Sequence, residues 1–375
     1  MIFDVQHISG QIYFYLLVKD KLFYDFFNFN LSFTIGKTKY SLKKNLVTGA
    51  TGLVGTHIVL DLLKKGQAVR ATCTPRSNKK IMEQVFQHYN CHDLFGEIEW
   101  VNMELDDVTE VYNAVDGVDF VYHSAAIVSF NKSDFNSMRI INIEGTANIV
   151  NACLEKKVQK LGFISSIASI GRQGSGHYNE KNKWSSGKEN SFYALTKYKA
   201  ENEVWRGLEE GLDAVICNPG IILGPSNWRR SSTTLFKQIY KGLSHYPLGE
   251  NGFVDVRDVS KAIIQLVEKN IKGERYILVG ENLPYKVVFD EIATQLNKQK
   301  PHKKATKSLL ELAWKMEAIR CFITNRKPGI TKETARTSSQ VNIYDNQKVI
   351  NELNFTFNSI KDAVSNTASY FLKFK

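Results

Sequence analysis

The segment Thr48-Gly-Ala-Thr-Gly-Leu-Val-Gly55 lies directly between a short apolar run and a helical pattern. The run from Asn45 to Thr48 predicts a buried strand, and apolar residues at helical spacing predict a helix from Val54 to Lys65. Glycines at this spacing permit a tight turn, close approach of the backbone to a diphosphate, and close packing of helix on strand. The segment predicts a nucleotide-binding turn with phosphates at the helix N-terminus; a tight turn without a ligand is the alternative. The residues expected to contact the nucleotide here are Gly49, Thr51, Gly52, Leu53, Val54 and Gly55.

After Lys44 the chain alternates short apolar runs with longer helical patterns, which is typical of a parallel sheet wrapped by helices. Besides the first strand, strands are expected at Ala68–Thr72, Ile98–Val101, Val118–Tyr122, Leu161–Ile164 and Ala214–Cys217. Six such strands predict an α/β fold of the Rossmann type, a doubly wound parallel sheet. The later pattern is mixed, with expected elements at Phe253–Val256 (strand), Ser260–Lys269 (helix) and Arg275–Val279 (strand). Residues 286–375 predict a smaller, mostly helical lobe that closes over the site.

We therefore expect three parts: an N-terminal extension at residues 1–43, a nucleotide-binding domain at 44–225, and a substrate-binding lobe at 226–375 that partly returns to the sheet. The first 44 residues contain eleven Phe or Tyr and no Ala, Pro, Arg or Glu. Their apolar run, Gln11 to Val18, has Asp4 as the only charge before it and no small-residue cleavage site after it, so no secretory signal peptide is expected. A strand-forming extension and an upstream segment joined to the domain are the two interpretations left open.

Composition and charge argue against several classes of protein. Hydrophobic residues make up 43% of the 375 positions and charged residues 23%, which excludes collagen-like and wholly disordered chains. No apolar stretch reaches about 18 residues, so no membrane-spanning helix is expected. The net charge is +11, but the excess is spread along the chain without a basic, aromatic-interleaved patch, so nucleic-acid binding is not expected.

The cysteines indicate the redox environment. There are five, widely scattered and never in a C-x-x-C pair: Cys73, Cys91, Cys153, Cys217 and Cys321. This pattern predicts neither a disulfide framework nor a metal site. A cytoplasmic location is therefore expected.

The region after the second strand bears on the choice of cofactor. NAD-preferring sites carry a carboxylate there that binds the ribose 2′-hydroxyl. Between Gly66 and Ile81 this chain has no Asp or Glu, whereas Arg70, Arg76, Lys79 and Lys80 are available for a 2′-phosphate. We therefore expect NADP(H) to be favoured over NAD(H); an ordinary solvated basic loop is the alternative.

A second motif, Tyr193-Ala-Leu-Thr-Lys197, lies within a predicted helix from Ser191 to Leu208. The i, i+4 spacing places phenol and ammonium on one helix face, where the cation stabilises a phenolate and lowers the pKa of tyrosine from about 10. Taken alone, Y-x-x-x-K is weak evidence, because chance matches are common. The segment Ile164-Ser-Ser-Ile-Ala-Ser-Ile-Gly171 strengthens it, because it carries hydroxyls at a strand end, where doubly wound sheets bind ligands.

In order and spacing, these motifs resemble those of the extended short-chain dehydrogenases/reductases, also called the NAD-dependent epimerase/dehydratase family. The resemblance covers roughly Lys44 to Val279. The matching positions are Thr48–Gly55, Glu104-Leu105, Ala125-Ala126, Asn142–Thr146, Ser166 before Gly171, Tyr193–Lys197, Asn218-Pro219 and Gly224-Pro225. Two pieces, Ile222–Pro225 and Phe253–Val259, are most similar to dihydroflavonol reductases and 3β-hydroxysteroid dehydrogenases, which suggests alcohol/carbonyl redox chemistry.

The resemblance implies further cofactor contacts. They are adenine at Glu104 and Leu105, the cofactor after the fourth strand at Ala125 and Ala126, and nicotinamide at Pro219. Tyr193 and Lys197 are also expected to contact the cofactor.

Two positions depart from the family's pattern. Thr74 stands where many reductases carry Arg, so the contact to a 2′-phosphate is expected to shift to Arg76 or Arg70. The acidic contact to adenine is more often Asp than the Glu found at position 104.

The resemblance also implies catalytic roles. Tyr193 would be the general acid/base, Ser166 would orient the substrate oxygen, and Lys197 would lower the pKa of the tyrosine and hold the nicotinamide ribose. Asn142 would hold a water that relays protons to Lys197; a hydrogen bond from Asn142 to a neighbouring backbone carbonyl is the alternative.

Other residues carry narrower expectations. Trp228 and Arg229 follow the Gly224-Pro225 pair, where the family's substrate pocket is lined, so they are expected to join Ser166 at the substrate, with a solvated loop as the alternative. His123 has no partner at metal-ligand spacing and is expected to be a buried, hydrogen-bonded histidine. No metal is expected.

Together these expectations describe an NAD(P)-dependent oxidoreductase acting on a carbonyl or secondary alcohol of a small molecule. A nucleotide-sugar epimerase or dehydratase with tightly bound NAD is one alternative, and a non-catalytic NADP-sensing protein is another. The substrate is not identified by the sequence, and a homodimer is left open.

Overall fold

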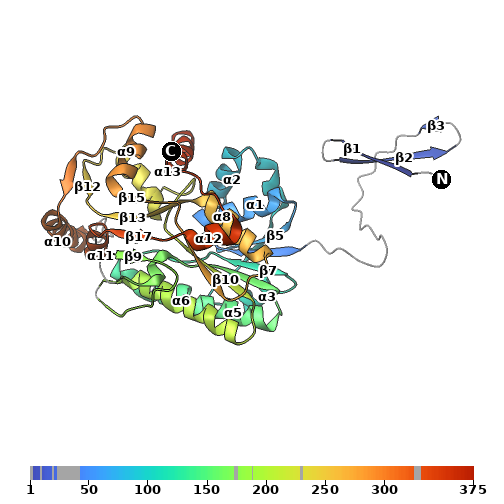
Figure 1. The fold of residues 1–375 in the computed structure, drawn as a ribbon, viewed down its shortest axis with the longest axis horizontal. Helices are drawn as coiled ribbons and strands as arrows, with labels where there is room; N and C mark the ends of the chain where they lie inside the picture. The colour runs from blue at the N-terminus through green and yellow to red at the C-terminus, as the bar shows by residue number, and fades with distance from the viewer. Residues whose placement is uncertain are drawn as a thin grey trace. The chain divides into compact units, whose positions relative to one another are not determined.

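The structure is a computed structural model of the chain, and it describes residues 3–8, 11–18, 21–22, 43–172, 176–187, 189–228, 231–324 and 331–375. The chain divides into two compact units, residues 1–42 and 43–375 (Figure 1). In the first unit, β1 (Phe3–Ile8) pairs antiparallel with β2 (Gln11–Val18), and β2 pairs antiparallel with β3 (Lys21–Leu22). The apolar run of the N-terminal extension is therefore a strand; the role of the extension stays a prediction.

The second unit is built on a central sheet of seven parallel strands. They are β4 (Lys44–Thr48), β5 (Ala68–Cys73), β6 (Glu99–Asn102), β7 (Phe120–His123), β8 (Lys160–Ile164), β10 (Ala214–Pro219) and β14 (Glu274–Leu278). Their order across the sheet is β6-β5-β4-β7-β8-β10-β14. The chain thus winds outward from β4 in both directions, and the predicted doubly wound α/β fold is confirmed. The first six strands coincide with the six expected ones, and the seventh, β14, coincides with the strand expected at Arg275–Val279.

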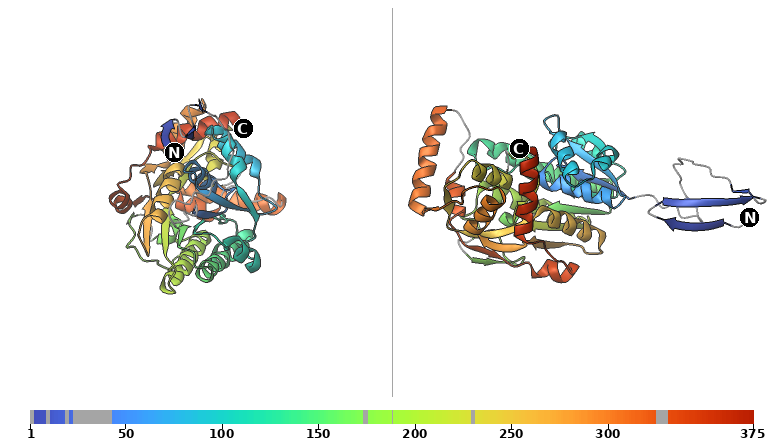
Figure 2. Two further views of the ribbon diagram at one scale, coloured as in Figure 1. Left: turned by 90° about the vertical axis from the view of Figure 1, so that its right-hand side faces the viewer. Right: turned by 90° about the horizontal axis from the view of Figure 1, so that it is seen from above.

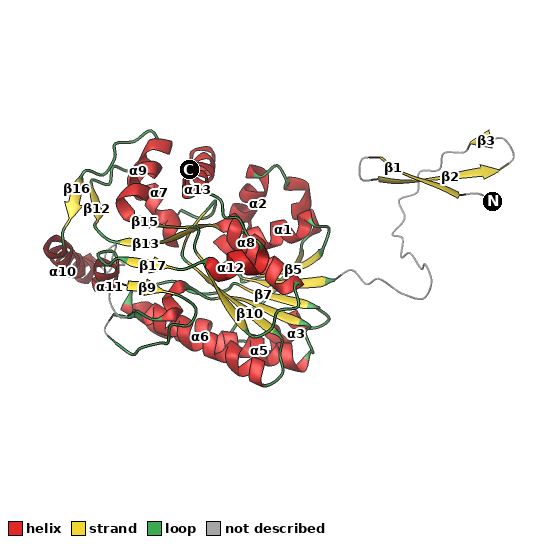
Figure 3. Cartoon of the chain, viewed as in Figure 1, coloured by secondary structure: helices red, strands yellow, loops and turns green. Residues whose placement is uncertain are grey.

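Helices cover both faces of this sheet (Figure 3). One face carries α1 (Leu53–Lys64), α2 (Lys79–His88), α8 (Val256–Glu268) and α12 (Gln347–Leu353), and the other carries α3 (Val108–Val115), α5 (Gly145–Glu155) and α6 (Phe192–Glu209). Successive side chains of a strand point to opposite faces of the sheet and so pack into the two cores alternately. Leu46 packs on the side of α5 and α6, and Val47 packs on the side of α1 and α8. This alternation fixes which face of each strand is available to each helix layer.

Helix α8 begins at Val256, four residues earlier than the expected start at Ser260. The cause is Asp255, whose carboxylate accepts a hydrogen bond of 2.8 Å from the backbone N–H of Arg257. This side-chain cap satisfies one of the free N–H groups of the first turn and allows the helix to start there.

A smaller lobe adjoins the sheet and contains short strands as well as helices. Its strand pairs are β11 (Ile221–Leu223) with β13 (Glu250–Asp255), β13 with β15 (Glu281–Pro284), β12 (His245–Pro247) with β16 (Lys303–Ala305), and β9 (Gly176–Tyr178) with β17 (Asn342–Tyr344). Its helices are α7 (Thr234–Tyr240), α9 (Tyr285–Gln295), α10 (Lys307–Thr324), α11 (Lys332–Thr337) and α13 (Ile360–Phe374). A short helix, α4 (Phe135–Met138), precedes α5.

The core of this lobe lies between α7, α9 and α13, where Phe236, Ile292 and Val364 are buried together. Figure 2 shows the last helix, α13, in red. The lobe is formed by more than one stretch of chain, because α8 and β14 come between its segments in sequence yet belong to the sheet and its covering layer. The expected domain boundary at residue 225 stays a prediction. Within the described parts of the chain, no helix has both the length and the apolar character needed to cross a bilayer.

Candidate active site

The turn between β4 and α1 has a geometry that only glycine permits. Gly49 has φ +64°, and a Cβ added there would lie 2.7 Å from the Cα of Ala125. A Cβ on Gly55 would lie 2.3 Å from the carbonyl oxygen of Gly49. Non-bonded carbon atoms do not approach this closely, so no side chain fits at either position. Gly49 allows the turn to pack against the segment after β7, and Gly55 allows the helix to pack on that turn.

The N-terminus of α1 is free to receive an anion. Its N-cap is Gly52, which has no side chain to cap the helix, and the first turn contains no acidic residue. The N–H groups of a first helical turn have no partner inside the helix, and the helix dipole favours negative charge at this end. Leu53 and Val54 stand in this turn and Thr51 just before it, and all three are partly exposed. The residues present thus fit a diphosphate, as the glycine spacing predicts.

The edge after β5 presents positive charge without a carboxylate. Thr74 and Ser77 form a turn in which the Ser77 N–H donates to the carbonyl of Thr74 across 2.9 Å. Arg76 lies in this turn, and its side chain is exposed. Its position after the carboxyl end of β5 is where the ribose of a dinucleotide lies in Rossmann folds.

Arg70 requires a correction. Its guanidinium donates 2.8 Å hydrogen bonds to Glu99 at the start of β6 and to the backbone carbonyls of Ala114 and Asp116 at the end of α3. These partners lie at the amino-terminal edge of the sheet, because α3 runs antiparallel to the strands and Glu99 is the first residue of β6. The cofactor turn follows the carboxyl ends, so the structure holds the Arg70 guanidinium away from the position expected for a 2′-phosphate and leaves Arg76 as the candidate contact.

The predicted adenine and fourth-strand positions line the same edge. Leu105 is buried, and a Cβ on Gly145 would lie 2.7 Å from the Leu105 Cβ, so the segment after β6 packs tightly on α5. Glu104 is partly buried, and its backbone N–H donates a 2.7 Å hydrogen bond to the Glu110 carboxylate. Of the alanines after β7, Ala125 backs the glycine turn and Ala126 is exposed.

Helix α6 carries the predicted tyrosine and lysine. Ser191 caps it by accepting a hydrogen bond of 3.0 Å from the Ala194 N–H, so the helix starts one residue before Tyr193. Tyr193 is partly buried and Lys197, one turn later, is 2% exposed. The Lys197 ammonium donates a 2.8 Å hydrogen bond to the carbonyl of Ile164, at the end of β8. The ring of Phe163 lies 4.4 Å from the same nitrogen.

Ser166 faces the tyrosine from the turn that follows β8. Its hydroxyl accepts a hydrogen bond of 3.1 Å from the Ala168 N–H, which starts a short 3₁₀ turn at Ile167–Ile170. Burial raises the pKa of Tyr193 to about 12, and a hydrogen bond with the Ser166 side chain acts to lower it. The predicted serine and tyrosine therefore meet, although Y-x-x-x-K and the serine segment are far apart in sequence.

Electrostatics make Lys197 unusual. Burial lowers the pKa of Lys197 to about 7, while the nearby negative charge of Glu201 acts to raise it. An ammonium with a pKa near neutrality is suited to a site where a proton is exchanged.

Asn142 lies in a wide helical turn at Arg139–Glu144 and has partners other than Lys197. Its amide oxygen accepts from the Ile127 N–H at 2.7 Å, and its amide nitrogen donates to the Ile127 carbonyl at 2.9 Å and to the Thr196 hydroxyl at 3.1 Å. This is the backbone-bonded alternative, and it ties the segment after β7 to α6. The water-relay role stays a prediction.

The remaining predicted positions lie elsewhere or outside the described residues. Pro219 is buried as the last residue of β10, next to Asn218. Trp228 packs on Phe371 of α13, with ring centroids 4.7 Å apart, and belongs to the core of the smaller lobe. This packing gives Trp228 a structural role; its expected contact with the substrate stays a prediction. Arg229 lies outside the described residues.

His123 is buried and hydrogen-bonded, as expected. Its ring nitrogens lie 2.6 Å from the Thr48 hydroxyl and 3.0 Å from the Thr146 hydroxyl. Burial lowers the pKa of His123 to about 3, so the ring is neutral at ordinary pH.

Sequence reasoning missed two residues beside the pair on α6. The ring of Phe130 meets the ring of Tyr193 edge-on, with centroids 6.0 Å apart. Glu201 is buried one turn after Lys197 and accepts hydrogen bonds from the serine turn. The i, i+4 spacing from Lys197 to Glu201 is the signal that could have identified the glutamate.

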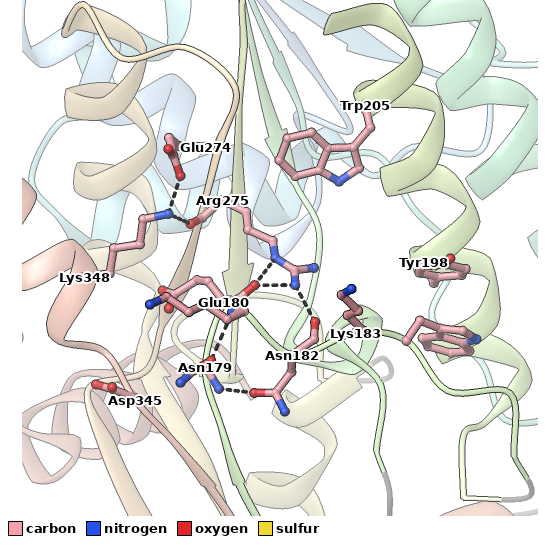
Figure 4. A pocket seen from close by; sticks show the side chains of 12 residues that line it. Asn179, Glu180, Asn182, Lys183, Tyr198, Trp205, Glu274, Arg275, Asp345 and Lys348 are labelled. Atoms are coloured by element: carbon pink, nitrogen blue, oxygen red, sulfur yellow. Dashed lines mark hydrogen bonds and ion pairs between the residues drawn. The ribbon is translucent and has the colours of Figure 1, made fainter. Parts of the chain in front are cut away.

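A surface hollow lies away from these residues. It has a volume of about 1060 Å³ and is lined by the 179–184 segment, by Tyr198 and Trp205 of α6, and by Arg275 and Lys348 (Figure 4). None of the predicted catalytic side chains lines it, so its size alone does not make it the active site.

Comparison with known proteins agrees with this geometry. The family model described as the NAD dependent epimerase/dehydratase family matches residues 45–280. A Synechocystis protein provisionally named a dihydroflavonol 4-reductase is 28% identical over 334 residues, covering 87% of this chain and 93% of its own. Sterol demethylase protein B of Methylococcus capsulatus is 26% identical, covering 87% of this chain and 97% of its own. The crystal structure of gox2253 superposes with a TM-score of 0.73 at 28% identity, covering 88% of this chain and 98% of that one.

Proposed function

Because the chain belongs to the NAD dependent epimerase/dehydratase family, we propose that it transfers a hydride between a nicotinamide cofactor and a carbonyl or secondary alcohol of a small organic substrate. The observation that carries the proposal is the meeting of Ser166, Tyr193 and Lys197 at the carboxyl ends of β8 and its neighbours. A relative named as a reductase supports the redox assignment.

Each side chain has a distinct part in the proposed chemistry. Bound nicotinamide supplies or accepts the hydride. Tyr193 gives its phenolic proton to the substrate oxygen during reduction and takes it back during oxidation. Ser166 donates a hydrogen bond to that oxygen, and the Lys197 ammonium stabilises the phenolate that Tyr193 becomes. Burial raises the pKa of Tyr193 to about 12, so the phenol alone is a poor acid at neutral pH and the proposed chemistry requires its phenolate form to be stabilised.

The glycine turn and the start of α1 would hold the diphosphate, and Glu104, Leu105, Ala125, Ala126 and Pro219 would line the rest of the cofactor site. We propose NADP(H) over NAD(H), with Arg76 as the contact to the 2′-phosphate. The support is the exposed guanidinium after β5 and the lack of a carboxylate between Gly66 and Ile81. A 2′-hydroxyl would find no acidic acceptor there.

A reducing cytoplasm is the proposed location, supported by the five cysteines, all of which are free thiols. We propose a small-molecule partner only, and the oligomeric state is left to direct measurement.

The proposal is tested by the purified protein and a panel of aldehydes, ketones, sterols and flavonoids, with NADPH absorbance as the readout. We expect consumption of NADPH with at least one carbonyl class and weaker turnover with NADH. Dinucleotide that co-purifies and does not exchange, with no net consumption of NADPH, would contradict the proposal and favour an epimerase or dehydratase. If the protein binds neither NADP(H) nor NAD(H), the proposed function is refuted.

A further inference from the structure

A buried carboxylate lies directly behind the proposed catalytic pair. Glu201 of α6 is 1% exposed. One of its oxygens accepts hydrogen bonds from the hydroxyls of Ser165 at 2.8 Å and Ser169 at 2.6 Å, and from the Asn218 amide at 3.0 Å. Burying a charge is costly unless it is paired and hydrogen-bonded, so such a site exists only where its partners are built for it.

The second oxygen of Glu201 has a charged partner. The Arg275 guanidinium, from β14, forms an ion pair with it at 3.0 Å. The same guanidinium donates to the backbone carbonyls of Glu180 and Asn182, at the wall of the large hollow (Figure 4). The carboxylate therefore connects α6, the turn after β8, the end of β10, and β14.

Two of these contacts bracket the proposed catalytic serine. Ser165 precedes Ser166 in the chain, and Ser169 closes the 3₁₀ turn that Ser166 begins, with its hydroxyl also 2.7 Å from the Ser166 carbonyl. The Asn218 amide donates to that same carbonyl at 3.1 Å. The turn that carries Ser166 is thus fastened to the helix that carries Lys197.

From this arrangement we infer that Glu201 is a positioning residue of the active site: it anchors the Ser166 turn to α6 and places a negative charge one helical turn from Lys197. This inference rests on the proposed function. Glu201 touches neither the reacting atoms nor Tyr193, and acts through its neighbours.

The charges around Lys197 fix the direction of the effect. Glu201 is on the same helix, Arg275 approaches Glu201 from β14, and His123 approaches from β7 and is neutral because burial lowers its pKa to about 3. Tyr193 is neutral below its raised pKa. Glu201 is thus the one negative charge acting on Lys197 within the described contacts, and it opposes the lowering of the pKa by burial.

The test compares the pH dependence of turnover in four proteins: wild type, Glu201→Gln, Arg275→Gln and Glu203→Gln. Glu201→Gln removes the negative charge near Lys197, so the lysine should lose its proton at a lower pH. Because turnover needs the protonated lysine, the basic limb of the pH profile should move down by about one pH unit or more. In Arg275→Gln the competing cation is gone, so the same limb should move up. Glu203 pairs with Arg206 on the outer side of α6, and its variant is the matched control, with an unchanged profile.

A purely structural role for Glu201 predicts a different pattern, in which both variants lose activity by the same factor at every pH and the limb stays in place. That pattern would overturn the inference. Glu201→Asp keeps the charge, so it should restore the wild-type position of the limb even if its rate is lower. If Glu201→Gln does not fold, the opposite shift in Arg275→Gln still decides the matter.

A second readout separates this inference from the proposed function. The side-chain carbon signal of ¹³C-labelled Lys197, assigned by its loss in Lys197→Arg, reports the pKa of the amine without turnover. A lower pKa in Glu201→Gln and a higher one in Arg275→Gln support the inference even if the substrate panel gives no reaction, which would contradict only the proposed function. If the pKa of Lys197 is unchanged in both variants, the inference is contradicted. Turnover by the wild type in the substrate panel would in that case still support the proposed function.

Discussion

The ammonium of Lys197 donates a hydrogen bond to the backbone carbonyl of Ile164 across 2.8 Å, which joins helix α6 to the last residue of strand β8. Ser166 follows that strand by two residues, and Tyr193 precedes the lysine by one helical turn. The hydroxyl proposed to orient a substrate and the phenol proposed to exchange its proton are therefore held at the end of a strand and on a helix, which favours a preorganised site.

Tyr193→Phe should lower turnover by roughly 10²-fold or more while leaving cofactor affinity within about twofold, because the ring remains and only the proton donor is lost. Tyr198→Phe is the matched control: Tyr198 is on the same helix but stacks on Trp184, with centroids 4.5 Å apart. Steady-state kinetics and cofactor titration by fluorescence check both. Near-normal turnover in Tyr193→Phe would show that Tyr193 is not the general acid.

Lys197→Met should lose more activity than Tyr193→Phe and should also weaken cofactor binding, because both the cation and the proposed ribose contact are removed. The same variant should be more stable toward unfolding than the wild type, although its activity is lower. The folded state lowers the pKa of Lys197 to about 7 from 10.5, so burying the charged form opposes folding.

This opposition is fully present below pH 7 and fades as pH rises toward 10, where the unfolded lysine also loses its proton. Denaturant unfolding should therefore show Lys197→Met to be more stable than wild type, most clearly near pH 6. Lys199→Met, at an exposed position on the same helix, is the control. A stability difference that does not change with pH would contradict the buried-charge explanation.

Arg76→Ala should reduce the preference for NADP over NAD by about ten- to a hundredfold, since a charge-assisted contact from Arg to phosphate contributes on the order of 1.5 to 3 kcal/mol. The preference of the wild type should also weaken as salt is raised. Arg70→Ala should leave the ratio unchanged, because its guanidinium is bound to Glu99 and the end of α3. Equal affinities in wild type, or an unchanged ratio in Arg76→Ala, would mean that the phosphate lies elsewhere.

A chain that begins at Ser41 should fold and bind cofactor as the full chain does, because the compact unit starts at Lys43 and its first strand at Lys44. Circular dichroism, thermal unfolding and cofactor titration of the two chains test this. Insoluble protein after truncation would show that the eleven aromatic rings of residues 1–44 belong to the core.

Much of the fold follows from local pattern. The glycine turn, the first six strands and the starts of α1 and α6 depend on short-range periodicity and capping, which the sequence displays directly. The direction of the Arg70 side chain cannot be predicted from local pattern, because it depends on the register of β5 beside β6 and on where α3 ends. The same holds for the packing of Trp228 on α13, a helix more than 130 residues away, and for Glu201, whose partners come from β8, β10 and β14 or the turns that follow them.

The seventh strand has a consequence for how the molecule is made and exchanged. Because β14 pairs with β10 only after the chain has passed through β11, α7 and β13, the sheet edge beyond β10 stays uncovered during synthesis until residue 278 has left the ribosome. The smaller lobe is interleaved with the sheet in this way and is not a tail. A chimera that exchanges the smaller lobe with that of a relative should therefore keep α8 and β14 and exchange the segments on both sides of them, because the core of the lobe joins α7 to α9 and α13. Replacing everything after residue 225 would also replace one strand of the host's own sheet.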